Sequence, residues 1–301
     1  MKANRVGRVF LGLVVLALFV AYSYLKSSTT PFSSDIDARK DPTAISTAAP
    51  VDTDGPASAD PSAGPDAAPV DGEEAESPEA TPEPAPDPDS PAGRALALGL
   101  PKPPDIDITS WEYVLVNSTH EIGADFAPPE VVKVGATNCP QDSRIAEALT
   151  AFTEDCAAQG LPVYLSSGYR SYSDQQANFQ RKLNEGYSRE VAATIVAIPG
   201  TSEHQTGLCC DITDVYRSLK DPDVLSQTET FKWLNEHCAE YGFILRFPLG
   251  EKDITGIIYE PWHFRYVGVE AATYVKETEL TWEEFVALYT GESVPGSDLF
   301  P

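Results

Sequence analysis

Four histidines are the only imidazole side chains in the 301-residue sequence, which limits the metal sites that it can build. His120 lies in a polar, loop-like stretch, and His237 lies on the wet side of a predicted helix. We expect neither of them to have a functional role. His204 and His263 remain as candidates, because each has a carboxylate close by in the sequence.

His204 lies seven residues before Asp211, in a loop that leads into a predicted strand over 208–213. Side chains alternate between the faces of a straight strand, so residues seven apart point in opposite directions. His204 and Asp211 can converge only if the chain bends between them, and Gly207 permits that bend. A carboxylate in an apolar strand also requires a cation or hydrogen bonds. This segment alone is equally compatible with an exposed loop histidine and a capping carboxylate.

An aromatic-rich segment supplies the third candidate group, with Glu260, His263 and Arg265 close together. His263 and Arg265 share a strand face, and Pro261 must turn the chain for Glu260 to act with His263. Two histidines and one carboxylate form a three-ligand zinc site with a fourth position open for water. A further carboxylate that does not bind the metal could act as general base, and Glu260 is the candidate.

Four segments in this order resemble the VanY-type D-alanyl-D-alanine carboxypeptidases, zinc peptidases that trim peptidoglycan stem peptides. The resemblance extends over about residues 111–269. It rests on 167–171 followed by Gln175 or Gln176, on 202–208 through Asp211, on 241–246 and on 260–263. Each segment is weak evidence alone, but the four together are specific. One departure is visible, because Cys209 and Cys210 stand where such proteins usually carry small or aliphatic residues.

The resemblance implies a role for each candidate residue. One zinc ion is held by His204, Asp211 and His263, and Glu260 is the catalytic base. Arg170 binds substrate or stabilises the transition state, and the pocket is lined by Ser202, Gln176 and Trp262. The implied activity is removal of the C-terminal D-alanine from a peptidoglycan stem peptide. Two alternatives stay open: an L,D-carboxypeptidase acting on tetrapeptide stems, and a domain that binds cell-wall peptides without cleaving them.

Helices and strands alternate irregularly in the part of the chain that must position these residues. The patterns predict helices over 142–158, 174–184, 190–196, 229–241 and 282–289, and strands over 111–116, 163–166, 208–213, 243–247, 257–259 and 262–266. They indicate one α+β domain over 106–290, with a mainly antiparallel sheet flanked by helices. The resemblance implies the fold shared by Hedgehog proteins and D,D-peptidases.

The N-terminus has the layout of a membrane anchor. A basic tail over 1–8 precedes an apolar, uncharged run over 9–25. As a helix, this run would be about 25 Å long, near the lower limit for crossing a bilayer. The run ends in Ala21-Tyr22-Ser23-Tyr24-Leu25, and its two tyrosines suit a membrane interface. We therefore expect an uncleaved signal-anchor rather than a cleaved signal peptide. The positive flank predicts that the remaining chain is extracytoplasmic.

Residues 26–105 are rich in proline, alanine and acidic residues, which predicts a disordered spacer between membrane and domain. The net charge of −25 argues against nucleic acid as a partner. We expect a monomer that acts on stem peptides, with a flexible C-terminal tail over 291–301.

The sequence has five cysteines, and because this number is odd, at least one of them must stay unpaired within the chain. We expect buried thiols, with a bond from Cys238 to Cys209 or Cys210 as the alternative.

Overall fold

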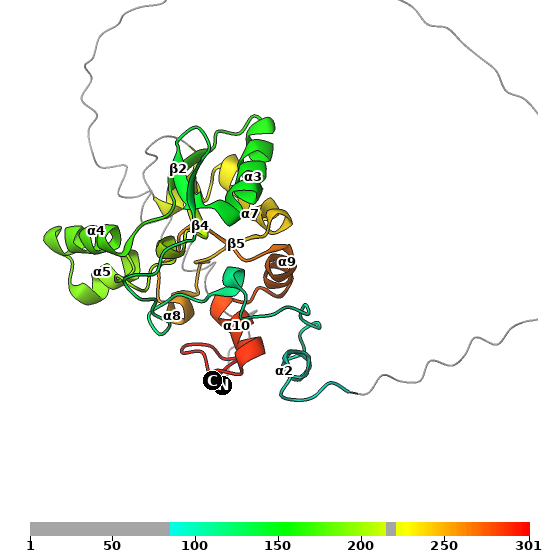
Figure 1. Cartoon of the computed structure of the whole chain (residues 1–301). Helices are drawn as coiled ribbons and strands as arrows, with labels where there is room; N and C mark the ends of the chain where they lie inside the picture. The colour runs from blue at the N-terminus through cyan, green and yellow to red at the C-terminus, as the bar shows by residue number, and fades with distance from the viewer. Residues whose placement is uncertain (1–84, 215–220) are drawn as a thin grey trace, which may run out of the picture. The chain divides into compact units, whose positions relative to one another are not determined.

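The computed structural model describes residues 85–214 and 221–301, which lie within one compact unit (Figure 1). The basic tail, the expected anchor over 9–25 and the linker up to residue 84 lie outside the described residues. No helix in the described part of the chain is long and apolar enough to cross a membrane.

A four-stranded antiparallel sheet forms the centre of the domain, in the order β3-β4-β6-β5. The strands are β3 (Tyr164–Ser167), β4 (Cys209–Thr213), β5 (Phe243–Leu245) and β6 (His263–Tyr266). A separate antiparallel hairpin consists of β1 (Val131–Val134) and β2 (Cys139–Asp142). The antiparallel α+β architecture that the sequence predicted is confirmed.

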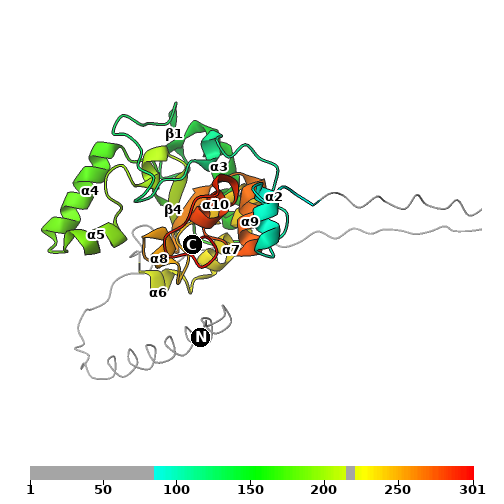
Figure 2. The same cartoon turned by 90° about the horizontal axis from the view of Figure 1, so that it is seen from below.

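Helices cover both faces of the sheet. Figures 1 and 2 show α3 and α7 on one side of the strands, α10 on the other, and α4 with α5 at one end. The α-helices are α2 (Pro91–Ala97), α3 (Ala146–Ala158), α4 (Tyr172–Asn184), α5 (Arg189–Ile195), α6 (Pro222–Leu225), α7 (Glu229–His237), α8 (Lys252–Thr255), α9 (Val269–Thr278) and α10 (Trp282–Thr290). Short 3-10 helices are η1 (Trp111–Tyr113), η2 (Ser143–Ile145), η3 (Glu203–Thr206) and η4 (Cys238–Tyr241).

The two faces of β4 and β6 differ in character because side chains alternate along a strand. Cys210, Ile212 and Phe264 lie on one face, in an apolar core shared with α3 and α7. Phe152 of α3 packs edge-to-face against Phe264 in this core, with the ring centroids 5.7 Å apart. The opposite face carries Cys209 and Asp211 of β4 with their β6 partners Arg265 and His263. The sheet therefore uses one face for stability and presents polar groups on the other.

Two predicted strands do not form. Residues 111–113 make the helix η1, and the carbonyl oxygens of Glu112 and Val114 accept hydrogen bonds from the Arg265 guanidinium at 3.0 and 2.8 Å. The Arg265 side chain thus supplies these carbonyl oxygens with the hydrogen-bond donors that a neighbouring strand would otherwise provide. Residues 257–259 form a loop instead of a strand, tied to the end of α5 by one backbone hydrogen bond from Ile258 to Thr194.

The predicted limits of the domain, 106 and 290, are too narrow on both sides. Helix α2 lies in the predicted linker, yet Arg94 donates hydrogen bonds to the carbonyl oxygens of Leu288 and Tyr289 at the end of α10. The predicted flexible tail is also packed, because Val294 and Phe300 are buried in the core around α9 and α10. Sparse apolar residues that pack against an existing core carry no periodic signal in the sequence.

Candidate active site

His204 lies in η3, and the chain turns directly after it. Gly207 has a φ of +70°, and a Cβ added there would lie 2.9 Å from Pro128 Cγ. The predicted bend is therefore present and leaves no space for a side chain. Nδ1–H of His204 donates to the carbonyl oxygen of Gly168 at 2.7 Å, which directs Nε2 toward Asp211 Oδ1 at 3.5 Å.

Asp211 and His263 are cross-strand partners in the register of β4 and β6. Nδ1 of His263 lies 3.1 Å from Asp211 Oδ1, while Nε2 lies 3.3 Å from Glu203 Oε2. The chain turns between Glu260 and β6, with the amide of His263 donating to the Glu260 carbonyl oxygen. This turn, which Pro261 was predicted to make, places Glu260 Oε2 3.7 Å from His263 Nδ1.

These groups fit a zinc ion. Two imidazole nitrogens and a carboxylate are donors that zinc prefers. Each histidine is oriented through its other nitrogen, as metal-binding histidines usually are: His204 by Gly168 and His263 by Glu203. With Nε2–H of His263 donated to Glu203, the Nδ1 lone pair faces the Asp211 carboxylate. Two acceptors at 3.1 Å require a positive charge between them, which either a proton or a metal ion can supply.

The electrostatic environment agrees with this requirement. Burial alone would lower the pKa of both His204 and His263, but the neighbouring Cys209 and Asp211 outweigh burial and raise it. A cation at this position is therefore favoured. Ligand atoms of Asp211, Glu260 and His263 lie within 4.8 Å of one another, as do those of His204, Cys209 and His263. Cys209 thus borders the site.

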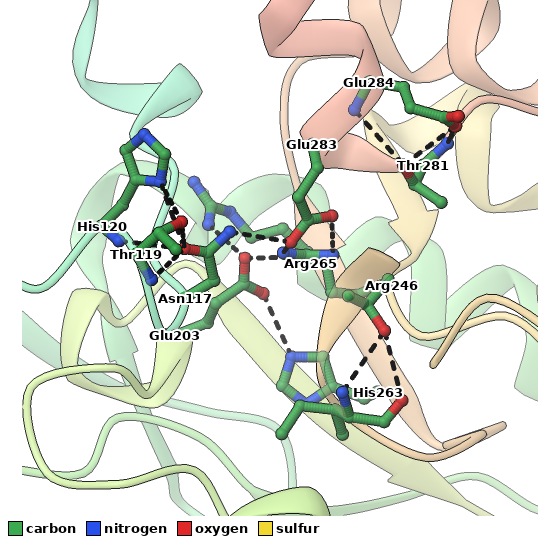
Figure 3. A network of polar contacts seen from close by, with 12 residues as sticks. Asn117, Thr119, His120, Glu203, Arg246, His263, Arg265, Thr281, Glu283 and Glu284 are labelled. Carbon is green, nitrogen blue, oxygen red and sulfur yellow. Dashed lines mark hydrogen bonds and ion pairs between the residues drawn. The ribbon is translucent and has the colours of Figure 1, made fainter. Parts of the chain in front are cut away.

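A buried network that the sequence analysis missed supports His263 from behind (Figure 3). Oε1 of Glu203 accepts hydrogen bonds from Arg246 Nε at 2.8 Å and from Arg265 Nη1 at 2.9 Å. Burial alone would raise the pKa of Glu203, but the two guanidinium groups hold it well below its usual range. Glu203 is therefore a fixed carboxylate that accepts from His263.

The network continues to the C-terminal helix. Both terminal nitrogens of Arg246 donate to the carboxylate of Glu283 in α10, at 2.9 and 2.6 Å. Asn117 also donates to Glu283, at 3.0 Å. Two glutamates therefore balance two buried arginines. The sequence held one hint: Arg265 lies in an aromatic-rich strand, and an arginine that is buried in such a strand must be paired with a negative charge.

A cavity of about 340 Å³ opens over these groups. Of the predicted pocket residues, Arg170, Ser202 and Trp262 line it together with Glu260 and the His–Asp–His cluster. The guanidinium of Arg170 is fixed by hydrogen bonds to Ser167 Oγ and Gln175 Oε1. The prediction for Gln176 is wrong, because it is exposed. Its neighbour Gln175 lines the cavity instead, since adjacent positions on α4 point about 100° apart.

Similar sequences come from bacterial carboxypeptidases. Residues 140–269 match the family model described as VanY, D-alanyl-D-alanine carboxypeptidase. The YodJ protein of Bacillus subtilis (strain 168) is 39% identical over 140 residues, 46% of this chain and 51% of that protein. A D-alanyl-D-alanine carboxypeptidase of Enterococcus faecalis (strain ATCC 700802 / V583) is 36% identical over 191 residues, 60% of this chain and 67% of the relative. The chain thus spans about half of the first relative and two thirds of the second.

Solved structures share the fold. The LdcB LD-carboxypeptidase has a TM-score of 0.53 at 31% identity, covering 59% of this chain and 86% of its own. A mutant of the vancomycin resistance D,D-pentapeptidase VanY in complex with Zn(II) has a TM-score of 0.52 at 35% identity. The match covers 59% of this chain and 99% of that protein. VanYB in complex with D-alanine-D-alanine has a TM-score of 0.51 at 36% identity. The match covers 59% of this chain and 98% of that protein. Together with the antiparallel sheet and its polar cluster, these similarities show that the chain belongs to the VanY family of D-alanyl-D-alanine carboxypeptidases.

Proposed function

We propose that the domain is a zinc-dependent D,D-carboxypeptidase that removes the C-terminal D-alanine from peptidoglycan stem peptides. The observation that carries this proposal is the convergence of His204, Asp211 and His263 at an open cavity, with Glu260 beside them. A structural zinc site would be closed by a fourth protein ligand and would not need a cavity. The zinc-bound and D-alanine-D-alanine-bound neighbours support the choice of metal and substrate.

Each residue has a distinct task in the proposed reaction. His204 Nε2, His263 Nδ1 and Asp211 would hold one zinc ion, which when bound acidifies water and polarises a carbonyl group. Glu260 takes a proton from the attacking water and then donates a proton to the leaving amine. Its side chain is only 13% exposed, so few solvent molecules compete for that proton.

Arg170 is the fixed cation of the cavity. Its hydrogen bonds to Ser167 and Gln175 hold the guanidinium in one orientation, so it stabilises developing negative charge without reorganisation. An exopeptidase must also recognise the terminal carboxylate of its substrate, which requires a placed donor. Ser202, which is buried and lines the cavity, and Arg170 are the candidates for this contact.

The proposal is tested by mass spectrometry of the products formed from purified stem peptides of three, four and five residues. We expect loss of one alanine from the pentapeptide only. Cleavage of the tetrapeptide alone would favour the L,D-carboxypeptidase, which the similarity to LdcB supports as second candidate. Zinc retention without cleavage of any stem would favour the peptide-binding domain.

Glu260→Gln tests the assignment of the base. The amide cannot accept the proton of water, so we expect kcat to fall by about 10²–10⁴-fold while zinc content is unchanged. Steady-state kinetics with metal analysis checks this. The control is Glu229→Gln on the surface of α7, where the side chain is 74% exposed. Full activity of Glu260→Gln with zinc bound would contradict the assignment.

We also propose that the domain acts outside the cell while tethered to the membrane. The support is in the sequence: an apolar, uncharged run over 9–25 after a basic tail, and an acidic, proline-rich stretch before the domain. Protease treatment of intact cells from which the wall has been removed tests the orientation. We expect the folded domain to be released, whereas a protected domain would exclude this topology.

A further inference from the structure

Two buried cysteine side chains meet behind the metal cluster. Cys139 lies in β2 and Cys210 in β4, and their Sγ atoms are 4.0 Å apart. Cys139 is 4% exposed and Cys210 is fully buried. They are 71 positions apart in the sequence, so only the fold brings them together.

The separation is close to what a covalent bond requires. A disulfide has an S–S length of about 2.05 Å, so each sulfur must move by about 1 Å. All five cysteines are free thiols in this structure, so neither the expected alternative from Cys238 to Cys209 or Cys210 nor a bond between Cys139 and Cys210 is formed in it.

The pair touches two segments that adjoin the cluster of His204, Asp211 and His263. Cys210 directly precedes Asp211 in β4, with its side chain on the opposite face of the sheet. Cys139 lies against Gly168, where an added Cβ would be only 2.8 Å from the Cys139 sulfur. The carbonyl oxygen of Gly168 accepts the hydrogen bond that orients His204. A bond between these two cysteines would therefore join the hairpin that packs on Gly168 to the strand that carries Asp211.

We propose that Cys139 and Cys210 are a disulfide site, oxidised by exchange with a disulfide donor while the chain folds. One thiolate attacks the donor RS–SR and releases RS⁻, which forms a mixed disulfide. The second cysteine then attacks the protein sulfur of the mixed disulfide and displaces the second RS⁻. The two cysteine protons end on the released thiols, and the donor is reduced to two RSH. Burial of the finished bond in the core protects it from later reduction.

The bond has a measurable consequence for stability. A cross-link between positions 71 residues apart removes conformational freedom from the unfolded chain. We expect the oxidised protein to melt on the order of 10 °C above the reduced protein. Because the link constrains β2 and β4 behind Gly168 and Asp211, we also expect slower loss of zinc to a chelator in the oxidised form.

The test uses the full-length protein, folded either with oxidised glutathione or with a reductant. Free thiols are alkylated under denaturing conditions, and the protein is digested without reduction for mass spectrometry. We expect one cross-linked peptide pair joining Cys139 and Cys210 in the oxidised sample, with Cys156, Cys209 and Cys238 alkylated. No cross-link, or a link to any other cysteine, would overturn the proposal. This experiment uses the wild-type protein, so its outcome does not depend on whether a variant folds.

Variants then test the effect on stability. Cys210→Ala should abolish the difference in melting temperature between the oxidised and reduced samples. The matched control is Cys209→Ala, next in the chain but on the opposite face of β4, which should keep both the cross-link and the difference. Equal melting of oxidised and reduced wild type, with the cross-link present, would remove the stabilising role. None of these measurements depends on peptidase activity, so they are independent of the proposed reaction.

Discussion

Glu203 connects the proposed zinc site, formed by His204, Asp211 and His263, to the rest of the protein through one carboxylate. It accepts from Nε2 of His263 and, on its other oxygen, from Arg246 and Arg265. A negative charge at this point keeps the proton of His263 on Nε2, so that Nδ1 stays available for the metal. Such partners fix ring orientation and increase the basicity of the ligand.

Glu203→Gln tests this role. A neutral amide is a weaker acceptor for the His263 proton, so we expect zinc affinity to fall by about 10–100-fold. Glu283→Gln is the matched control, because Glu283 also pairs with Arg246 but does not contact the described metal cluster. Both changes should destabilise the fold, by about 3 kcal/mol each. Competition with a chromophoric chelator measures the affinity; equal losses in the two variants would assign Glu203 a purely structural role.

The bend between η3 and β4 is the element that makes His204 and Asp211 converge. Gly207 adopts a left-handed conformation there, and its amide and carbonyl groups bond to His204 and Asp142. The turn before β6 acts in the same way for Glu260 and His263. In both places the strand register then fixes the second residue of the pair, because Asp211 of β4 lies opposite His263 of β6. Local turns and long-range strand pairing therefore position the cluster together.

Gly207→Ala should disturb this bend. The added Cβ would combine a strained φ with contacts of 2.9 Å to Pro128 and 3.0 Å to the backbone of Asp142. We expect a loss of about 1–3 kcal/mol in unfolding free energy and weaker zinc binding. Gly160→Ala is the control, since Gly160 also has a positive φ but has open space around it. Urea denaturation with zinc titration distinguishes them; unchanged zinc affinity in Gly207→Ala would show that the bend tolerates a side chain.

At the scale of the whole molecule, both ends of the described domain pack against α10. Arg94 of α2 caps the carbonyl end of α10, and Ser297 near the C-terminus donates to Glu284 in its first turn. Glu283 in the same turn belongs to the network that ends at His263. The C-terminal helix therefore supports the site, although it supplies none of the cavity-lining residues.

Two truncations test where the folded domain begins. Deletion of residues 1–84 leaves in place every contact that α2 makes within the described domain, so we expect no change in melting temperature. Deletion of residues 1–105 removes the Arg94 hydrogen bonds and buried Ala95, and should lower the melting temperature by several degrees. Differential scanning calorimetry compares them. Equal melting of the two truncated proteins would restore residue 106 as the boundary.

Much of the site could be predicted from sequence because its parts are local. Gly207 between His204 and Asp211, and Pro261 between Glu260 and His263, marked the places where the chain had to bend for each pair to converge. The strands 208–213 and 262–266 were predicted close to their observed limits, since buried strands carry strong apolar patterns. The prediction that Gln176 lines the pocket did not hold, because a choice between adjacent helical positions requires the orientation of α4.

The sequence by itself determined the α+β class, the family and the candidate residues of the cluster, because these depend on residue types and on short spacings. The tertiary structure alone decided which carbonyls and carboxylates orient the two histidines, that Glu203 is held between two arginines, and that Cys139 meets Cys210. It also decided that α2 and the C-terminal residues belong to the core. Such contacts join positions tens to nearly two hundred residues apart, and no periodicity along the chain encodes them.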